Sequence, residues 1–586
     1  LYDVNEIDKS LVDASSIYTN LSEIKKLESW SVDNWSFSNS DLTVMQNDYV
    51  NFYEGILKWY NDFSSSLLSE NLAYQGLAYK QAANSIQSMD KEWSRIWFVG
   101  LNALTKSEQV ILDFLKNKNI ARVFWDADKY YYENEMHEAG SFLREQRSKW
   151  SEIDFDGVGN YFKSKKNSFN IISCPRNISQ AKVASEILSS LEEIDVNESN
   201  TALVLSDESL LYPVLHNLPS SIPMINVTMG TPLKGSSLFS FFEVMFDIHL
   251  NALKYKNDRF HIKDISRLIQ HAYFNFLVPS EAIESFNNYI NERNIVFVNK
   301  IDIENVFNNQ LVNDIFQNVQ NPKNFVLLLI NVIEEIRPHV LNKKASVESE
   351  IFATFYRSLN IVNNLLDQSQ FDFELKTLYV IMQQLVAKES IPFKGEPLKG
   401  LQIMGILESR TLDFDNVIML SVNEGKLPTG KSVNSFIPYD LKKYFKLPTY
   451  SERDAVFAYH FYRLLQRAKN VSLIYNSETD DFGNGEKSRF ITQLLAEYDG
   501  TINEYVYDGF LDNKRETYNH IIKNQGLEER IKLWAKKGVS PSALNLYNNC
   551  SLHFYYHYLA DIKINDELTE HSDERTIGNA IHNTLD

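Results

Sequence analysis

Apolar residues recur at two spacings along the chain, and the spacing changes several times. From residue 1 to about 90 they recur every three to four positions, which predicts helices. Short runs rich in aromatic and β-branched residues then predict strands at 96–99 and 123–125, with a helix at 107–118 between them. Strands that alternate with helices indicate a parallel sheet.

The alternation returns near residue 168 and continues to about 500. Continuous apolar runs predict buried strands, and amphipathic stretches between them predict helices. Gly230-Thr231-Pro232 predicts a turn, with Ser236 or Ser237 capping the next helix. The predicted strands are 170–173, 202–205, 417–422 and 471–475, and the predicted helices are 180–193 and a helix that follows the capping-box-like start at Ser451–Asp454.

From about 250 to 390 the pattern is almost entirely helical, with helices expected at 325–336, 351–366 and 373–387. A helical block therefore interrupts an α/β region that spans roughly 168–500. This arrangement is more informative than any single motif in the chain.

Composition narrows the class of protein. A chain of 586 residues suggests about four domains or lobes. With Lys+Arg 58 and Asp+Glu 77, the net charge of −19 excludes a uniformly basic nucleic-acid coat but leaves room for a local basic channel. Two cysteines, Cys174 and Cys550, exclude a disulfide scaffold and fit a cytoplasmic location. No apolar run reaches about 18 residues, so we expect no membrane span, and we expect no membrane among the partners.

Residues 425–432 fit the G-x-x-x-x-G-K-[ST] pattern of a phosphate-binding loop, with Gly430, Lys431 and Ser432 as its last three positions. Such a loop needs a helix that begins at the Lys-Ser pair and points its positive end at the phosphate. Pro438 would fall inside that helix at a cost of about 3 kcal/mol. We therefore interpret the segment as a strand-to-loop turn; a nucleotide site using Lys431 is the alternative.

The segment around the predicted strand 417–422 resembles a motif of superfamily 1 helicases of the UvrD type. The matching residues are Gly405–Arg410, Leu412–Val417, Asn423–Gly425 and Pro428. Further on, Arg463–Lys469 looks like the helix that closes the ATP site of those helicases, with Gln466 in place of a Thr. The resemblance implies that Arg467 would neutralise charge on the γ-phosphate of an active motor; a structural arginine is the alternative.

The C-terminal residues resemble the opening of the PD-(D/E)XK nuclease domain in AddB and its RecB-family relatives. The similar segments are Ser540–Cys550 with 554–556, and Gly578–His582. The resemblance implies that His582 binds the catalytic Mg²⁺ or Mn²⁺ and that Cys550 is one of four iron–sulfur ligands. The alternative, which we favour, is that Cys550 is a small buried residue beside Tyr547 and Phe554.

The expected fold class is α/β: RecA-like parallel-sheet domains of the superfamily 1 helicase type with a large all-helical insertion, followed by the helical start of a PD-(D/E)XK nuclease domain. The expected parts are the first helicase-like domain with a helical subdomain (1–165), the second RecA-like domain (166–250 and 391–500), the helical insertion (251–390), a helical linker (501–539) and the incomplete nuclease domain (540–586).

Some expected motifs are missing from the sequence. The resemblance places the helicase P-loop before Leu1 and the nuclease carboxylates beyond Asp586, so we expect a piece of a longer polypeptide that is inactive and binds no cofactor by itself. No Asp-Glu pair follows the strand 96–99, as Mg²⁺ binding in a motor requires. Asp126 and Asp128 could mimic a metal pair, although ordinary loop residues are the simpler interpretation.

The resemblance implies a DNA exonuclease subunit that processes double-strand breaks, with DNA ends and an AddA-like motor subunit as partners. A non-catalytic scaffold that binds DNA ends or a motor is the second hypothesis, and a nucleotide-hydrolysing enzyme using 425–432 is the third. The basic clusters are small and more typical of solvated faces, so the sequence assigns no DNA-binding residue; they are 163–166, 343–344 and 536–537.

Overall fold

The structure is a computed structural model of the chain. It describes residues 1–28, 44–88, 93–150, 158–164, 167–191, 200–255, 259–293, 295–317, 321–341, 347–368, 373–393, 399–429, 435–478, 485–507, 520–560, 562, 581 and 584. The chain divides into two compact units, Leu1–Met229 with Phe393–Gly509, and Gly230–Pro392 with Phe510–Asp586.

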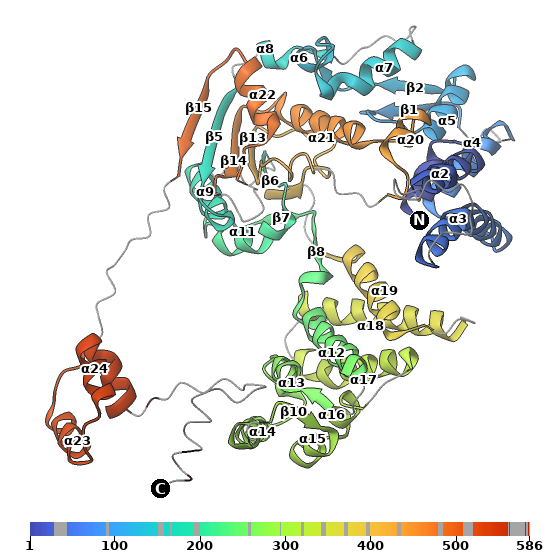
Figure 1. Cartoon of the computed structure of the whole chain (residues 1–586). Coiled ribbons are helices and arrows are strands. Elements are labelled where there is room, and N and C mark those ends of the chain that lie inside the picture. The colour runs from blue at the N-terminus through green and yellow to red at the C-terminus, as the bar shows by residue number, and fades with distance from the viewer. Residues whose placement is uncertain are drawn as a thin grey trace. The chain divides into compact units, whose positions relative to one another are not determined.

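A seven-stranded sheet forms the centre of the first unit (Figure 1). Its order is β15-β5-β14-β13-β6-β12-β7, and every pairing is parallel, which confirms the expected α/β class with a parallel sheet. The strands are β5 (Ser168–Cys174), β6 (Thr201–Leu205), β7 (Ile225–Val227), β12 (Leu401–Gly405), β13 (Asn416–Leu420), β14 (Asn470–Asn476) and β15 (Ile502–Val506).

Helices cover both faces of this sheet (Figure 1). Leu203 and Leu205 of β6 pack in one core with α9 (Asn177–Ser190) and α11 (Leu211–Asn217). Ala202 and Val204 point the other way, into a core with α21 (Tyr450–Leu465) and α22 (Arg489–Glu497). Since a strand buried on both faces has no polar side, its sequence is a continuous apolar run.

A smaller α/β layer shares the core of α21. In it β1 (Ile96–Val99) pairs in parallel with β2 (Ala121–Phe124), and α5 (Lys106–Asn117) connects them. After β2 come β3 (Ala127–Asp128), α6 (Lys129–Tyr132), η3 (Glu138–Gly140), α7 (Ser141–Lys149), β4 (Val158–Gly159) and α8 (Tyr161–Ser164). Tyr131 of α6 and Tyr462 of α21 are fully buried in the shared core, so this layer is bound tightly to the large sheet's helix.

The amino-terminal helices confirm the helical pattern before residue 90. They are α1 (Tyr2–Lys9), α2 (Ala14–Glu28), α3 (Val44–Ser69), α4 (Gln75–Ser85) and the short η2 (Ile86–Ser88). Asp8 is completely buried and accepts hydrogen bonds from Tyr60 (2.7 Å), Tyr74 and the Lys80 ammonium group (2.9 Å). These partners offset the cost of burying the charge. Apolar side chains of α1, α2 and α3 form one cluster, and the short α20 (Tyr439–Tyr444) packs in it.

The second unit contains a block of helices around its own apolar core. Its helices are α12 (Ser237–Tyr255), α13 (Ile262–Ile269), α14 (Ser280–Arg293), α15 (Lys300–Phe307), α16 (Gln310–Ile315), α17 (Pro322–Leu341), α18 (Val347–Gln368) and α19 (Leu375–Lys388). Two short strands pair antiparallel on it, β9 (Arg259–His261) and β10 (Phe297–Asn299). The three helices expected at 325–336, 351–366 and 373–387 are confirmed.

The prediction of a turn at residues 230–232 is wrong, because Gly230–Pro232 is a strand, β8. It pairs antiparallel with β11 (Ser390–Pro392), which brings the two ends of the helical block together. Gly230 permits the close approach, since a Cβ there would lie 2.5 Å from the Ser390 hydroxyl. The partner strand is about 160 residues away, so local composition could not reveal it.

The caps of two helices test the predicted starts. Ser236 caps α12 as expected, with its hydroxyl accepting from the Phe239 amide at 3.2 Å. The capping box of α21 begins at Thr449 and pairs with Glu452, so the expected start at Ser451 is two residues late. Among the helices of the described residues, none combines the length and the apolar character needed to cross a membrane.

Phe325 of α17 tests the core of the helical block. Its ring is fully buried and lies 4.6 Å from Phe246 and 5.0 Å from His249, measured between ring centroids. We expect Phe325→Ala to destabilise the block by roughly 3–5 kcal/mol, through lost burial and a cavity. Hydrogen exchange of α17 and α18 peptides in the full chain measures the change.

Leu327→Ala is the matched control on the same helix, because this leucine is 40% exposed. It should leave the exchange of those peptides close to that of the wild type. Equal effects of the two variants would contradict the packing described for α17.

Candidate functional site

A cluster of charged side chains lies where the segment after β2 meets the end of α21. Asp126 follows β2, Arg463 lies in the last turn of α21, and Arg467 lies just beyond it. The Arg463 Nε atom is 2.7 Å from Asp126 Oδ2, and the Arg467 Nη2 atom is 2.6 Å from Asp126 Oδ1. Asp413 from the loop before β13 lies 3.0 Å from Arg463 and 3.1 Å from Arg467. Two guanidinium groups thus face two carboxylates.

Burial and the two arginines shift the pKa of the Asp126 carboxyl in opposite directions. Removal from water raises the pKa of this carboxyl, but hydrogen bonds and charge from Arg467 and Arg463 outweigh that effect and hold the pKa below its usual value. Desolvation lowers the pKa of Arg467, and the bonds to Asp126 and Tyr161 with the nearby carboxylates raise it overall. Both groups are therefore ionised at neutral pH.

Neighbouring side chains hold the cluster in place. Gln466 donates from its amide nitrogen to Asp126 Oδ1 at 2.8 Å and accepts from the Tyr131 hydroxyl at 2.9 Å. The Tyr459 hydroxyl donates to the Asp126 carbonyl at 2.8 Å. The Arg467 guanidinium lies over the Tyr161 ring, 4.7 Å from its centroid. Gln466, which stands where the resembling helicase motif has Thr, thus works as a bridge between α21 and α6.

A cavity of about 410 Å³ opens beside the cluster. Gly100 lies in its wall with a φ of +69°, and a Cβ there would lie 2.5 Å from the Thr411 methyl group. A larger residue there would have to adopt an unfavourable dihedral angle and displace the Thr411 side chain, so glycine is favoured. The other lining residues are Val99, Trp125, Asp126, Val158, Gly159, Tyr161, Thr411, Asp413, Arg463 and Arg467.

Asp126 and Asp128 do not form a metal pair. Asp128 is fully buried and caps α6, where it accepts from the Tyr130 amide at 2.9 Å and from the Tyr161 amide. Burial raises the pKa of this carboxyl despite those bonds. Asp126 instead points at the arginines. Over the part of the chain that the structure describes, no three His, Cys, Asp or Glu side chains gather as metal ligands would.

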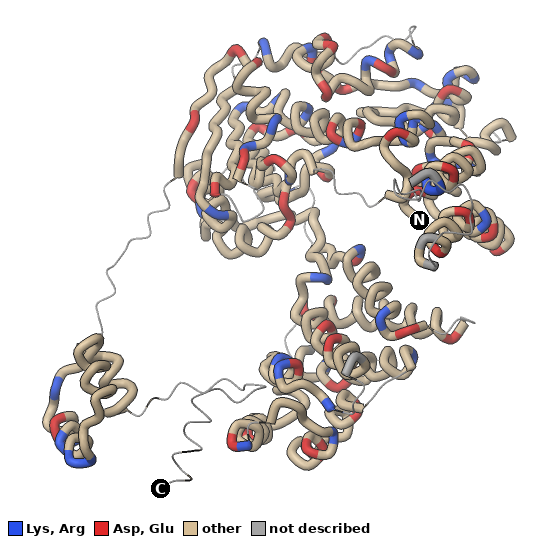
Figure 2. Tube along the Cα trace, viewed as in Figure 1, with Lys and Arg blue, Asp and Glu red and all other residues tan. Residues whose placement is uncertain are grey.

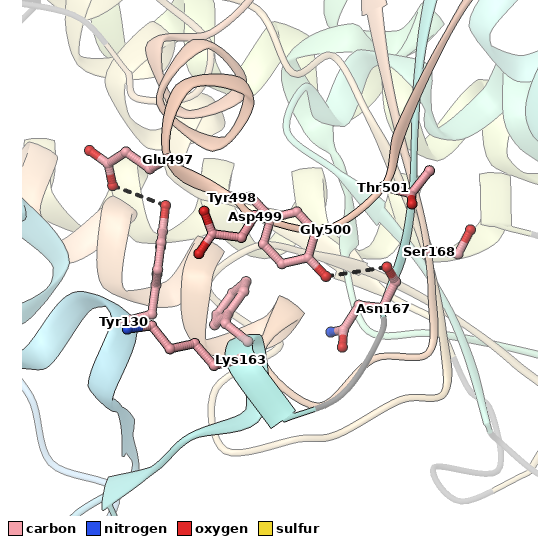
Figure 3. Close-up of a pocket in the computed structure, with 10 residues that line it drawn as sticks. Tyr130, Lys163, Asn167, Ser168, Glu497, Tyr498, Asp499, Gly500 and Thr501 are labelled. Carbon is pink, nitrogen blue, oxygen red and sulfur yellow. Dashed lines mark hydrogen bonds between the residues drawn. The ribbon is translucent and has the colours of Figure 1, made fainter.

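A second cavity of about 700 Å³ lies between α6, α8 and the turn after α22 (Figure 3). At one end Tyr130 donates to Glu497 at 3.0 Å, and at the other Tyr498 donates to the Asn167 carbonyl at 3.3 Å. Aromatic rings and the carboxylates Glu497 and Asp499 dominate its wall, which disfavours a phosphate. The remaining lining residues are Phe162, Lys163, Ser168, Gly500 and Thr501.

Only part of the phosphate-loop pattern at 425–432 belongs to the residues that the structure describes. Gly430, Lys431 and Ser432 fall outside the described residues. Gly425 has a φ of +82°, and the Lys426 ammonium group pairs with Asp207 at 2.8 Å. Residues 435–438 are not helical, and α20 begins at Tyr439. A helix from Lys431 therefore does not continue through 435–438.

The C-terminal helices form a small assembly of their own. It comprises α23 (Gln525–Lys536), α24 (Pro541–Asn549), α25 (Ser551–Phe554) and the π-helical turn η7 (Tyr555–Leu559). Ser540 caps α24 by accepting from the Ala543 amide at 3.2 Å, and Pro541 occupies the first turn, where it costs no hydrogen bond. The Phe554 ring packs edge-on against Trp534 and Tyr547, with centroids 5.0 and 5.3 Å apart.

Cys550 is exposed, so the expectation that it is a buried residue is wrong. It ends α24 and begins α25, and at this junction the helix does not cover its side chain. It lines an apolar groove of about 720 Å³ with Trp534, Leu544 and Tyr547 among others. No cysteine other than Cys174 accompanies it in the chain, and Cys174 is buried in the large sheet. His582 falls outside the described residues.

Comparison with known proteins bears on this C-terminal region. Residues 538–586 match the family model described as the PD-(D/E)XK nuclease superfamily. Among curated proteins, none matches the chain in sequence. The match begins two residues before the Ser540 cap and extends through α24 and α25. The C-terminal end is therefore similar to nucleases of this superfamily, which indicates a nuclease-type function.

The sequence pointed to Arg467 but not to its partners. The spacing of Arg463 and Arg467, four residues apart at the end of a helix, was a usable signal, because side chains at that spacing share one face. Asp126 and Asp413 are far from the arginines in sequence, so only the fold brings the four groups together.

The two cysteines are expected to differ in reactivity by orders of magnitude. Burial raises the pKa of the Cys174 thiol to about 12, whereas Cys550 is exposed. Since the thiolate is the reacting species, a chromogenic disulfide reagent should titrate one thiol rapidly in the native chain and the other only on unfolding. Cys550→Ser should remove the rapid phase and Cys174→Ala should preserve it. Two rapid thiols in the native wild type would contradict the assignment.

Proposed function

We propose that this chain is part of a DNA exonuclease subunit of the AddB-like, RecB-family kind, which processes double-strand breaks. The observation that carries the proposal is the match of residues 538–586 to the PD-(D/E)XK nuclease superfamily. Such nucleases hydrolyse phosphodiester bonds with metal-activated water, and Mg²⁺ or Mn²⁺ is the cofactor proposed here. His582, at the position of the Gly-x-x-x-His resemblance, is the proposed metal ligand within this chain.

The proposed role of the α/β body is to hold DNA ends and an AddA-like motor subunit. Its support is the order of helicase-like motifs along the sequence together with the parallel sheet of the first unit. Figure 2 shows Lys and Arg interspersed with Asp and Glu along the described chain. The DNA-contacting residues are thus not part of the proposal.

The second candidate function is a non-catalytic scaffold whose α/β body does not hydrolyse ATP, and the charged cluster favours it. Arg467, the residue that would meet a γ-phosphate in an active motor, is bonded to Asp126 and Asp413. A non-catalytic scaffold and a nuclease subunit are compatible, since hydrolysis of DNA and hydrolysis of ATP use separate sites.

His582→Ala tests the nuclease proposal in the full-length polypeptide that carries this sequence. We expect Mg²⁺- or Mn²⁺-dependent degradation of linear duplex DNA in the wild type, and a loss of more than about 100-fold in the variant, because a first metal ligand matters more than its outer-shell partners. Product release from end-labelled DNA measures the rate.

His557→Ala is the matched control, a second histidine within the matched residues 538–586, which lies in η7. It should retain the activity of the wild type. Equal loss in both variants, or cleavage that chelation of the metal leaves unchanged, would overturn the assignment of His582.

A further inference from the structure

The carboxylate of Asp126 accepts hydrogen bonds at both oxygens from donors of the kind that bind anions. Its Oδ1 atom accepts from Gln466 (2.8 Å) and Arg467 Nη2 (2.6 Å). Its Oδ2 atom accepts from Arg463 Nε (2.7 Å) and Arg467 Nη1 (3.2 Å). Four N–H groups therefore saturate two oxygens, and three of the four come from cationic side chains.

This geometry matches how proteins recognise a bound phosphate or carboxylate. The donors come from one turn of chain, because Arg463, Gln466 and Arg467 follow each other at the end of α21. The acceptor comes from another element, the segment after β2. The Arg463 side chain is only 4% exposed and that of Asp126 is 15% exposed, so the contact is shielded from salt.

We infer that Arg463, Gln466 and Arg467 form an anion site whose ligand is the chain's own Asp126, and that this internal ligand fastens the β2 segment to α21 without a bound phosphate. An external anion must displace a carboxylate that is tethered at high effective concentration. It must also approach Asp413, which repels it while pairing with the same arginines. The inference concerns the α/β body and does not depend on the nuclease proposal.

The adjoining cavity shows where an external anion would enter once Asp126 is neutral. It measures about 410 Å³, and two glycines, Gly100 and Gly159, keep its wall open. Exchanging Asp126 for Asn changes the charge of the cluster from zero to +1 and removes the competitor. The two guanidinium groups then face a cavity large enough for inorganic pyrophosphate.

Calorimetric titration of the full chain with inorganic pyrophosphate tests the inference. Wild type should bind pyrophosphate weakly, and Asp126→Asn should bind it at least about tenfold more tightly. The gain should vanish in Asp126→Asn combined with Arg467→Gln. Asp413→Asn is the control for net charge: it removes the same charge from a carboxylate that is 46% exposed and leaves Asp126 on its donors, so its gain in affinity should stay well below that of Asp126→Asn.

Two results would overturn the inference: wild type that binds pyrophosphate as tightly as Asp126→Asn, or a folded Asp126→Asn that gains nothing. Should Asp126→Asn not fold, the triple variant Asp126→Leu, Arg463→Met, Arg467→Met decides the matter. It should fold with a native circular dichroism spectrum, because apolar side chains replace the buried carboxylate and its two arginines together, while Asp413 is 46% exposed and remains hydrated. Failure of the triple variant would also overturn the inference.

Discussion

Parallel strands must be buried on both faces, and most of the first unit follows from that requirement. A parallel pair needs a long crossover, and a helix is the element that supplies it while covering a face. Here α9 and α11 cover one face of the seven strands, and α21 and α22 cover the other. The helix α21 has a second task, because its far side packs against the β1–β2 layer in the same core. The packing of α21 therefore positions the end of β2.

The position of α21 in turn explains why charges meet in a nearly closed place. The helix ends at Leu465, beside the segment that follows β2, and both arginines are at that end. A buried guanidinium without a counter-charge would be costly, so the fold supplies Asp126 and Asp413. The carboxylates remove the net charge of the cluster, and with it the attraction for phosphate that a bare arginine pair would exert.

Features encoded in neighbouring residues could be predicted from the sequence, and features made by distant segments could not. The strands β6 and β13 are continuous apolar runs, and the helices α17, α18 and α19 carry clear helical periodicity. The strand β8 was missed because its three residues look like a turn until β11 pairs with them. Cys550 was misjudged because apolar neighbours in sequence suggested burial, whereas the junction between α24 and α25 leaves its side chain outside.

The pairing of β8 with β11 has a consequence for how such a chain can change over evolutionary time. Gly230 stands opposite Pro392 in the register, so the chain enters and leaves the helical block at adjacent positions. An excursion with adjacent ends can lengthen, shrink or be exchanged for another while the strand order on either side is preserved. Insertions, deletions or replacements within the helical block can therefore create new surfaces while the sheet stays unchanged.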